Sequence, residues 1–159
     1  MSKETSDFRE KAAALLGRRA MSRWELVRKL REKGAPEEEA ERAAAWMESI
    51  GALDDAAYAA ALVRRCASRE YGPARVRAEL SKRGIPAELW EAAMAELPEE
   101  EELIRAFLER KRRGRTSDKD GTEDEAGEAD EKETRRLTAA LLRRGFSWGA
   151  VRSAMRHFS

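Results

Sequence analysis

Positively charged side chains are the residues of this chain best suited to chemistry, and that chemistry is the binding of anions. Arginine and lysine bind phosphate and carboxylate groups through charge and hydrogen bonds. The candidates for a partner-binding or DNA-binding surface are Arg64, Arg65, Arg69, Tyr71, Arg75, Lys82, Arg83, Arg143 and Arg144. For any single residue, an ordinary solvated helix surface is the alternative interpretation. Repetition of basic clusters along the chain favours binding.

Tyr71 lies between Glu70 and Gly72, where two predicted helices meet. Its ring can pack into this junction, which we favour, or stack on a base or a partner. The sequence has neither Asn nor Gln, the side chains that recognise adenine most directly. We therefore expect any nucleic-acid contact to involve phosphates rather than specific bases.

Catalytic and metal-binding constellations are missing from the sequence. The single histidine, His157, is at the end of the last predicted helix, where its charge would interact favourably with the helix dipole. The single cysteine, Cys66, shares a helical stripe with Tyr58 and Leu62, which predicts a buried thiol. There is no glycine-rich phosphate loop and no cysteine pair of a zinc site. We expect no enzymatic activity, no metal and no cofactor.

A recurrent turn separates the elements that must position the basic residues. In segments 30–36, 80–86 and 141–147, a leucine is followed by basic residues, a glycine and then Pro or Ser. This order is typical of a helix that ends on cations, is capped by a left-handed glycine and is followed by a new helix. The chain is therefore predicted to repeat a small helical unit.

Hydrophobic residues recur at the same spacing. Fifty positions separate Phe8 from Tyr58 and Leu30 from Leu80, and 61 positions separate Leu80 from Leu141. Periods of this length are typical of helical arrays. We predict an all-α fold of three tandem three-helix repeats, in an elongated, curved array. The predicted repeats cover residues 1–54, 55–98 and 99–159.

Local patterns predict where individual helices begin and which residues pack. Ser22 and Glu25 have the spacing of a capping box, and Asp54 or Asp55 is expected to cap the following helix. Three tryptophans are expected to pack within or between repeats: Trp24, Trp90 and Trp148.

An acidic insertion accounts for the extra length of the third repeat. Segment 117–133 has a net charge of −7, which leaves +8 on the rest of the chain. Residues 116 to about 131 include no Leu, Ile, Val, Phe or Tyr, so we predict disorder there and a resumption of structure near Glu133. The basic remainder favours a polyanion or an acidic protein as the partner.

The composition also limits the cellular setting. One cysteine in 159 residues fits a reducing cytoplasm, and no apolar run approaches the length that spans a bilayer. We expect a cytoplasmic monomer that does not enter membranes.

Several segments together resemble a known family. They comprise Leu53-Asp54-Asp55 with Tyr58-Ala59, then Gly72, Val76, Glu79-Leu80 and Lys82-Arg83-Gly84-Ile85, and finally Leu141-Leu142-Arg143-Arg144-Gly145-Phe146-Ser147. In this order they resemble the RecX regulators of the RecA recombinase, over about residues 8–158 without the acidic insertion, which departs from the family's short connection. The resemblance implies a non-catalytic protein that docks on the RecA–DNA filament. It further implies modulation, usually inhibition, of recombinase, ATPase and coprotease activity in recombination and the SOS response.

Two other functions remain open from the residues. One is a stand-alone nucleic-acid-binding helical module without base specificity, since short helices joined by tight glycine turns also occur in helix-turn-helix proteins. The other is a helical scaffold for an unrelated partner. Single-stranded DNA within the filament is a further expected contact.

Overall fold

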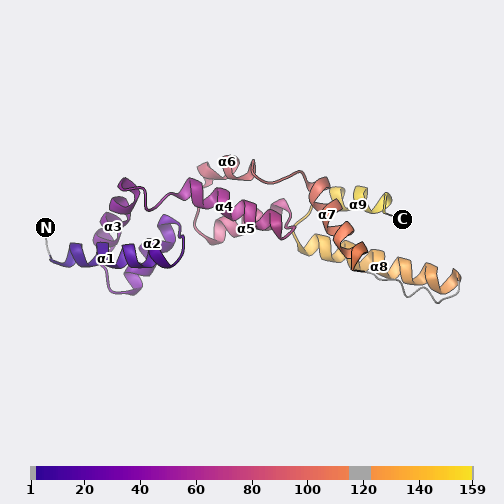
Figure 1. Ribbon diagram of the computed structural model, residues 1–159, viewed down its shortest axis with the longest axis horizontal. Helices are drawn as coiled ribbons and strands as arrows, with labels where there is room; N and C mark the ends of the chain where they lie inside the picture. The colour runs from indigo at the N-terminus through magenta and orange to yellow at the C-terminus, as the bar shows by residue number, and fades with distance from the viewer. Residues whose placement is uncertain (1–2, 115–122, 159) are drawn as a thin grey trace. The chain divides into compact units, whose positions relative to one another are not determined.

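The computed structural model describes the backbone of residues 3–114 and 123–158, and the regular structure in these ranges is helical (Figure 1). This confirms the predicted all-α fold class. The chain forms two compact units. Unit 1 contains residues 1–63 and 78–96, and unit 2 contains residues 64–77 and 97–159. The predicted repeat boundaries and the curvature of the array stay predictions.

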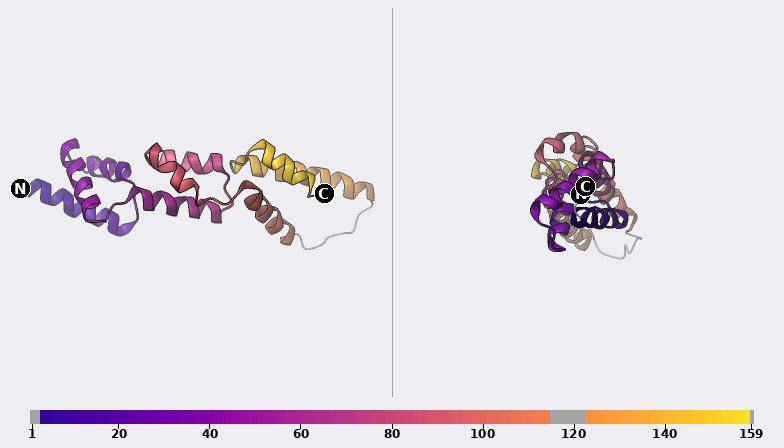
Figure 2. Two further views of the ribbon diagram at one scale, coloured as in Figure 1. Left: turned by 90° about the horizontal axis from the view of Figure 1, so that it is seen from above. Right: turned by 90° about the vertical axis from the view of Figure 1, so that its left-hand side faces the viewer.

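Unit 1 begins with three helices that pack on one another: α1 (Lys3–Arg18), α2 (Arg23–Glu32) and α3 (Glu37–Ser49) (Figure 2). Leu26 and Leu30 of α2 are fully buried in their shared core. Helix α3 contributes mainly small side chains, such as Ala40 and Ala44. Because alanine is small and favours the helix, α3 can approach its neighbours closely.

The rest of unit 1 comes from the second predicted repeat. It contains the first part of α4 (Asp55–Ser68), the last part of α5 (Pro73–Lys82), a 3₁₀ turn η1 (Ala87–Leu89) and α6 (Trp90–Met94). Helix α6 is short, and its first residue is held by a hydrogen bond from the Trp90 indole N–H to the Ile85 carbonyl, at 2.9 Å.

The predicted helix caps are confirmed. Ser22 and Glu25 form both hydrogen bonds of the capping box, and the Asp54 carboxylate accepts from the Ala57 N–H at 3.0 Å. The three glycines of the recurrent turn have left-handed φ angles: 96° at Gly34, 70° at Gly84 and 89° at Gly145. Local sequence therefore determines these turns in both units.

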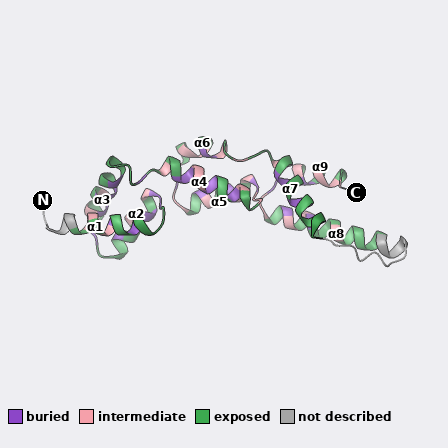
Figure 3. Ribbon diagram, viewed as in Figure 1, coloured by how far each residue is buried: buried purple, intermediate pink, exposed green. Residues whose placement is uncertain are grey.

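Unit 2 is built on α7 (Glu100–Arg113), α8 (Glu123–Arg143) and α9 (Trp148–Arg156), together with the end of α4 and the start of α5. Its core contains buried residues from each of the three helices and from the turn before α9 (Figure 3). Ile104, Phe107, Leu141 and Val151 are its fully buried members. This core anchors α7 and α8, which carry several of the unit's basic residues.

The expected start of structure near Glu133 is wrong, because α8 begins at Glu123. Segment 123–133 contains five Glu and two Ala, which are strong helix formers. Acidic residues at a helix N-terminus also interact favourably with the helix dipole. A segment can therefore lack large apolar residues and still extend a helix that its C-terminal half anchors. The preceding part of the predicted disordered segment, 116–122, lies outside the described residues.

The expected packing of the tryptophans is confirmed in part. Trp90 is half-buried, and Trp24 packs one face on the turn at Gly84, where an added Cβ would lie 2.6 Å from the indole. The remainder of Trp24 is exposed. Trp148 is 58% exposed, so its expected packing is wrong. As the first residue of α9 it points away from the core that Val151 enters.

Candidate partner-binding surface

Two turns of unit 2 meet backbone to backbone. The Gly72 N–H donates to the Arg144 carbonyl at 2.7 Å, and the Ala74 N–H donates to the Gly145 carbonyl at 3.1 Å. A Cβ on Gly72 would lie 2.5 Å from the Gly145 carbonyl carbon. A Cβ on Gly145 would lie 2.3 Å from the Arg75 nitrogen. The approach therefore requires glycine on both sides.

This contact brings arginines from two distant segments around one aromatic ring. The Arg75 guanidinium lies over the Tyr71 ring, 4.4 Å from its centroid, and the Arg144 guanidinium lies 5.9 Å away. Arg144 also lies 4.8 Å from the Phe107 ring centroid and donates to the Arg69 carbonyl at 2.6 Å. Cations over ring faces are attracted by the ring's quadrupole. We call Arg69, Tyr71, Arg75 and Arg144 the arginine–tyrosine cluster.

An ion pair fixes one side of this cluster. Glu70 has a left-handed φ of 60°, unusual for a side chain of its size, and its carboxylate accepts two hydrogen bonds from Arg110 of α7. The hydrogen bonds to Glu70 raise the pKa of Arg110 above its usual value. Because the pairing is bidentate, it fixes direction as well as distance. Glu70 therefore holds the turn that carries Tyr71 against α7.

Seven of the nine predicted site residues lie in unit 2. Four form the arginine–tyrosine cluster, with Tyr71 half-buried as the packing interpretation requires. Arg64 and Arg65 lie exposed on the last turns of α4, adjacent in sequence to this cluster. Arg143 is exposed on α8 and lines a separate groove toward α7.

The other two predicted residues, Lys82 and Arg83, belong to unit 1. Lys82 is exposed, but Arg83 is half-buried, with its guanidinium 3.7 Å from the Glu25 carboxylate. The Arg83 carbonyl also accepts the hydroxyl hydrogen bond of Ser22. Arg83 therefore packs the end of α5 against the start of α2.

Glu25 is the centre of this polar network. Its carboxylate lies 3.2 Å from the Arg19 guanidinium and accepts from the Tyr58 hydroxyl at 3.0 Å. Burial, followed by the hydrogen bond to Glu25, raises the pKa of Tyr58 above its ordinary value. A buried carboxylate is tolerated because several donors satisfy it. This satisfied charge thus joins the start of α2 to α4 and to the end of α5 within unit 1.

Sequence reasoning missed Phe107 and Arg110 as partners of the cluster. Arg110 lies 40 positions from Glu70 along the chain. Neither residue has a local pattern that identifies such a distant contact. In the described ranges the structure also contains no group of three or more His, Cys, Asp or Glu placed to hold a metal ion. The arrangement supplies exposed and ring-stacked cations, a chemistry suited to contact with anions.

Family comparisons agree with this architecture. A model of the first three-helix domain of RecX matches residues 9–47, and a model of its second three-helix domain matches residues 54–94. No helix among the described residues combines the length and apolar character needed to cross a membrane.

Whole-chain comparisons extend the match. Regulatory protein RecX of Stenotrophomonas maltophilia strain R551-3 is 37% identical over 148 residues, which cover 93% of this chain and 85% of the relative. Regulatory protein RecX of Xanthomonas campestris pv. campestris strain B100 is 35% identical over 147 residues, which cover 92% and 85%. The crystal structure of RecX from Lactobacillus salivarius matches the fold with a TM-score of 0.78 at 20% identity, covering 99% of this chain and 98% of that one.

Proposed function

Because the chain belongs to the RecX family of regulatory proteins, we propose that it binds the RecA–DNA filament and inhibits or modulates its recombinase, ATPase and coprotease activities. The observation that carries this proposal is the family match over almost the whole chain. The protein acts as a non-catalytic regulator, through occupancy of the filament.

The surface proposed to meet the filament is the end of α4 together with the arginine–tyrosine cluster. Arg65 and Arg69 are one helical turn apart, and both are exposed. Arg75 and Arg144 are restrained by their contacts with aromatic rings. A restrained side chain loses less conformational entropy when a partner binds. This supports a preorganised cationic surface for an acidic face of the partner.

The tandem units support binding to more than one protomer of the filament. When geometry permits simultaneous contact, modest contacts in each unit combine into high avidity. We propose that the protein docks as a monomer in the cytoplasm and also meets single-stranded DNA within the filament. The buried state of Cys66, 4% exposed, is consistent with a thiol kept reduced.

RecA-driven ATP hydrolysis on single-stranded DNA tests the proposal. The protein is added well below one molecule per RecA, and we expect clear suppression of hydrolysis. An unchanged rate, together with salt-sensitive binding to bare DNA, would instead favour the stand-alone nucleic-acid-binding module. Failure of RecA to bind in a pull-down would favour a scaffold for another partner.

Charge reversal tests the proposed surface. The triple variant Arg64→Glu/Arg65→Glu/Arg69→Glu should weaken inhibition of RecA at least tenfold. The double variant Arg65→Glu/Arg69→Glu should weaken it to a lesser extent. Circular dichroism should show the same helical content in both variants as in the unmodified protein. The matched control Lys29→Glu/Arg31→Glu reverses two exposed charges on α2 of unit 1. An inhibition curve that shifts equally for the double variant and the control would show a dependence on net charge alone.

A further inference from the structure

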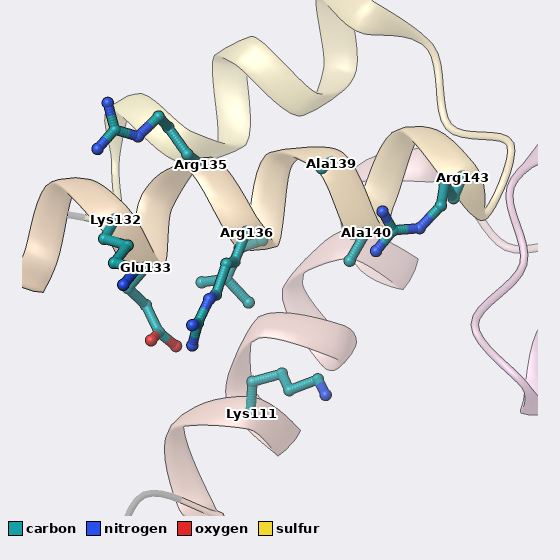
Figure 4. Close-up of a pocket in the computed structure, with 9 residues that line it drawn as sticks. Lys111, Lys132, Glu133, Arg135, Arg136, Ala139, Ala140 and Arg143 are labelled. Atoms are coloured by element: carbon teal, nitrogen blue, oxygen red, sulfur yellow. The ribbon is translucent and has the colours of Figure 1, made fainter.

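A basic groove lies between α7 and α8 of unit 2, apart from the arginine–tyrosine cluster. Its volume is about 610 Å³. Lys111 of α7 lines one wall, and Lys132, Arg136 and Arg143 of α8 line the other (Figure 4). Together with Glu133, which also lines it, these residues define the α7–α8 groove. Arg135 lines the same hollow, but its side chain points away from the other cations (Figure 4).

The cations of α8 form a row rather than a point. Lys132, Arg136 and Arg143 follow one another at intervals of four and seven residues, so they lie near one face of the helix. With a rise of 1.5 Å per residue, the row is roughly 16 Å long. Ala139 and Ala140 lie between Arg136 and Arg143 and leave the middle of the groove open. A row of this length fits a linear polyanion better than a single small anion.

The groove cations differ from Arg110 and Arg113 of α7, which are paired with carboxylates. Arg110 is paired with Glu70 at 3.0 Å, and Arg113 lies 3.7 Å from Glu109. Within the ranges that the structure describes, Arg136 and Arg143 are exposed and lie in no salt bridge. Lys111 is exposed too, with its amino group 5.7 Å from the Phe107 ring centroid. These charges are therefore accessible to a ligand.

The lining favours a nucleic-acid backbone over a protein segment. Protein interfaces obtain most of their affinity from buried aromatic or aliphatic anchors that fill pockets. The apolar residues of this groove are two alanines and Leu137, which is 4% exposed and already packed in the core. No pocket for an apolar anchor is left at the groove, whereas rows of Arg and Lys are sufficient for phosphate contacts.

From this geometry we propose that the α7–α8 groove binds the phosphate backbone of nucleic acid, with Arg136, Arg143 and Lys111 as the contacting cations. We expect the binding to depend little on base sequence, because the contacts go to phosphates and the chain has no Asn or Gln to read adenine. Glu133 opposes the ligand at one end of the row. This site goes beyond the proposed docking on RecA and does not require that protein.

Fluorescence anisotropy of a labelled 30-nucleotide oligothymidine, with the full chain at 50 mM salt and without RecA, tests the site. Arg136→Glu/Arg143→Glu should weaken binding at least tenfold. The slope of log K against log salt should fall by about 1.4, since each phosphate contact on a single strand contributes about 0.7. The control Lys29→Glu/Arg31→Glu changes the net charge equally and should stay within threefold of the unmodified protein. A labelled duplex in a second arm distinguishes single-stranded from double-stranded backbone, and either ligand supports the site.

A gain of binding provides an independent readout. Glu133→Gln removes the opposing charge and should tighten binding about two- to threefold, which a general loss of structure would not produce. Equal weakening by the groove variant and the control would overturn the proposal, as would a lack of binding by the unmodified protein. Displacement of the oligonucleotide by a ten-residue polyglutamate peptide at the same charge concentration would also overturn it, in favour of an acidic protein segment. Because RecA is absent, each of these results leaves the filament proposal to its own test.

Discussion

In unit 1 Arg19, Arg23 and Arg83 lie against carboxylates, whereas in unit 2 Arg75 and Arg144 lie against aromatic rings. Arg23 pairs with Glu41 and Glu48, each at 2.6 Å, and Arg19 pairs with Glu25 at 3.2 Å. In unit 2, Arg75 and Arg144 cover Tyr71 and Phe107. A cation already paired with a carboxylate attracts a further anion weakly, but a ring-stacked cation keeps its full charge. The named arginines of unit 1 thus stabilise packing, whereas Arg75 and Arg144 of unit 2 keep a charge that a further anion can use.

The recurrent glycine turn also has different surroundings at Gly34 of unit 1 and at Gly145 of unit 2. At Gly34 of unit 1 an added Cβ would meet nothing within 4 Å, while at Gly145 of unit 2 it would meet the backbone of Arg75. Both glycines have left-handed φ angles. One local motif therefore serves as a simple helix end at Gly34 and as a contact surface at Gly145.

The largest expected effect comes from Gly145→Ala. The substitution adds left-handed strain and places a methyl group 2.3 Å from the Arg75 nitrogen, so the two turns of unit 2 must separate. We expect a loss of at least about 3 kcal/mol in the free energy of unfolding, measured in urea. Gly34→Ala adds the left-handed backbone strain without a steric clash, so it should lower the free energy of unfolding by about 1 kcal/mol. Equal losses in the two variants would contradict the difference between the turns.

A smaller loss is expected for Glu25→Ala in unit 1. The substitution leaves Arg19, Arg83 and the Tyr58 hydroxyl without their shared acceptor in a part-buried site. We expect a cost of about 2–3 kcal/mol in the free energy of unfolding. Glu32→Ala is the matched control, because it breaks an exposed pair with Arg28 at 3.7 Å and should cost under about 0.5 kcal/mol. If both variants were equally stable, the contacts of Glu25 would not be what holds α2 against α4 and the end of α5.

The smallest effect is expected for Tyr58→Phe and depends on pH. Near neutral pH the lost hydrogen bond to Glu25 should cost about 1 kcal/mol. The folded state holds the Tyr58 proton more tightly than the unfolded state, because burial and Glu25 raise its pKa. The contribution of the Tyr58 hydroxyl to the free energy of unfolding is thus complete below the ordinary tyrosine pKa of about 10. It is lost as the pH rises through the pKa that Tyr58 has in the folded protein. Urea unfolding at pH 8 and above pH 10 should show the variant losing less stability with pH than the unmodified protein does.

Much of the local structure could be predicted from the sequence. The capping box at Ser22, the cap at Asp54 and the three glycine turns each depend on residues within a few positions. The start of α8 was predicted too late. A lack of large apolar side chains argues against independent folding, but it does not prevent strong helix formers from extending an anchored helix.

The sequence by itself determined the helices, their caps, the repeated turn and the basic character of the chain, because these depend on short-range hydrogen bonds, backbone sterics and composition. Only the tertiary structure decided which arginines are paired with carboxylates and which remain available. Arg83 and Arg144 occupy matching places before a glycine, yet Arg83 lies against Glu25, and Arg144 lies between Tyr71 and Phe107. Their partners are 58 and 37–73 positions away in the sequence, and only folding brings such distant groups within the few ångströms over which these interactions act.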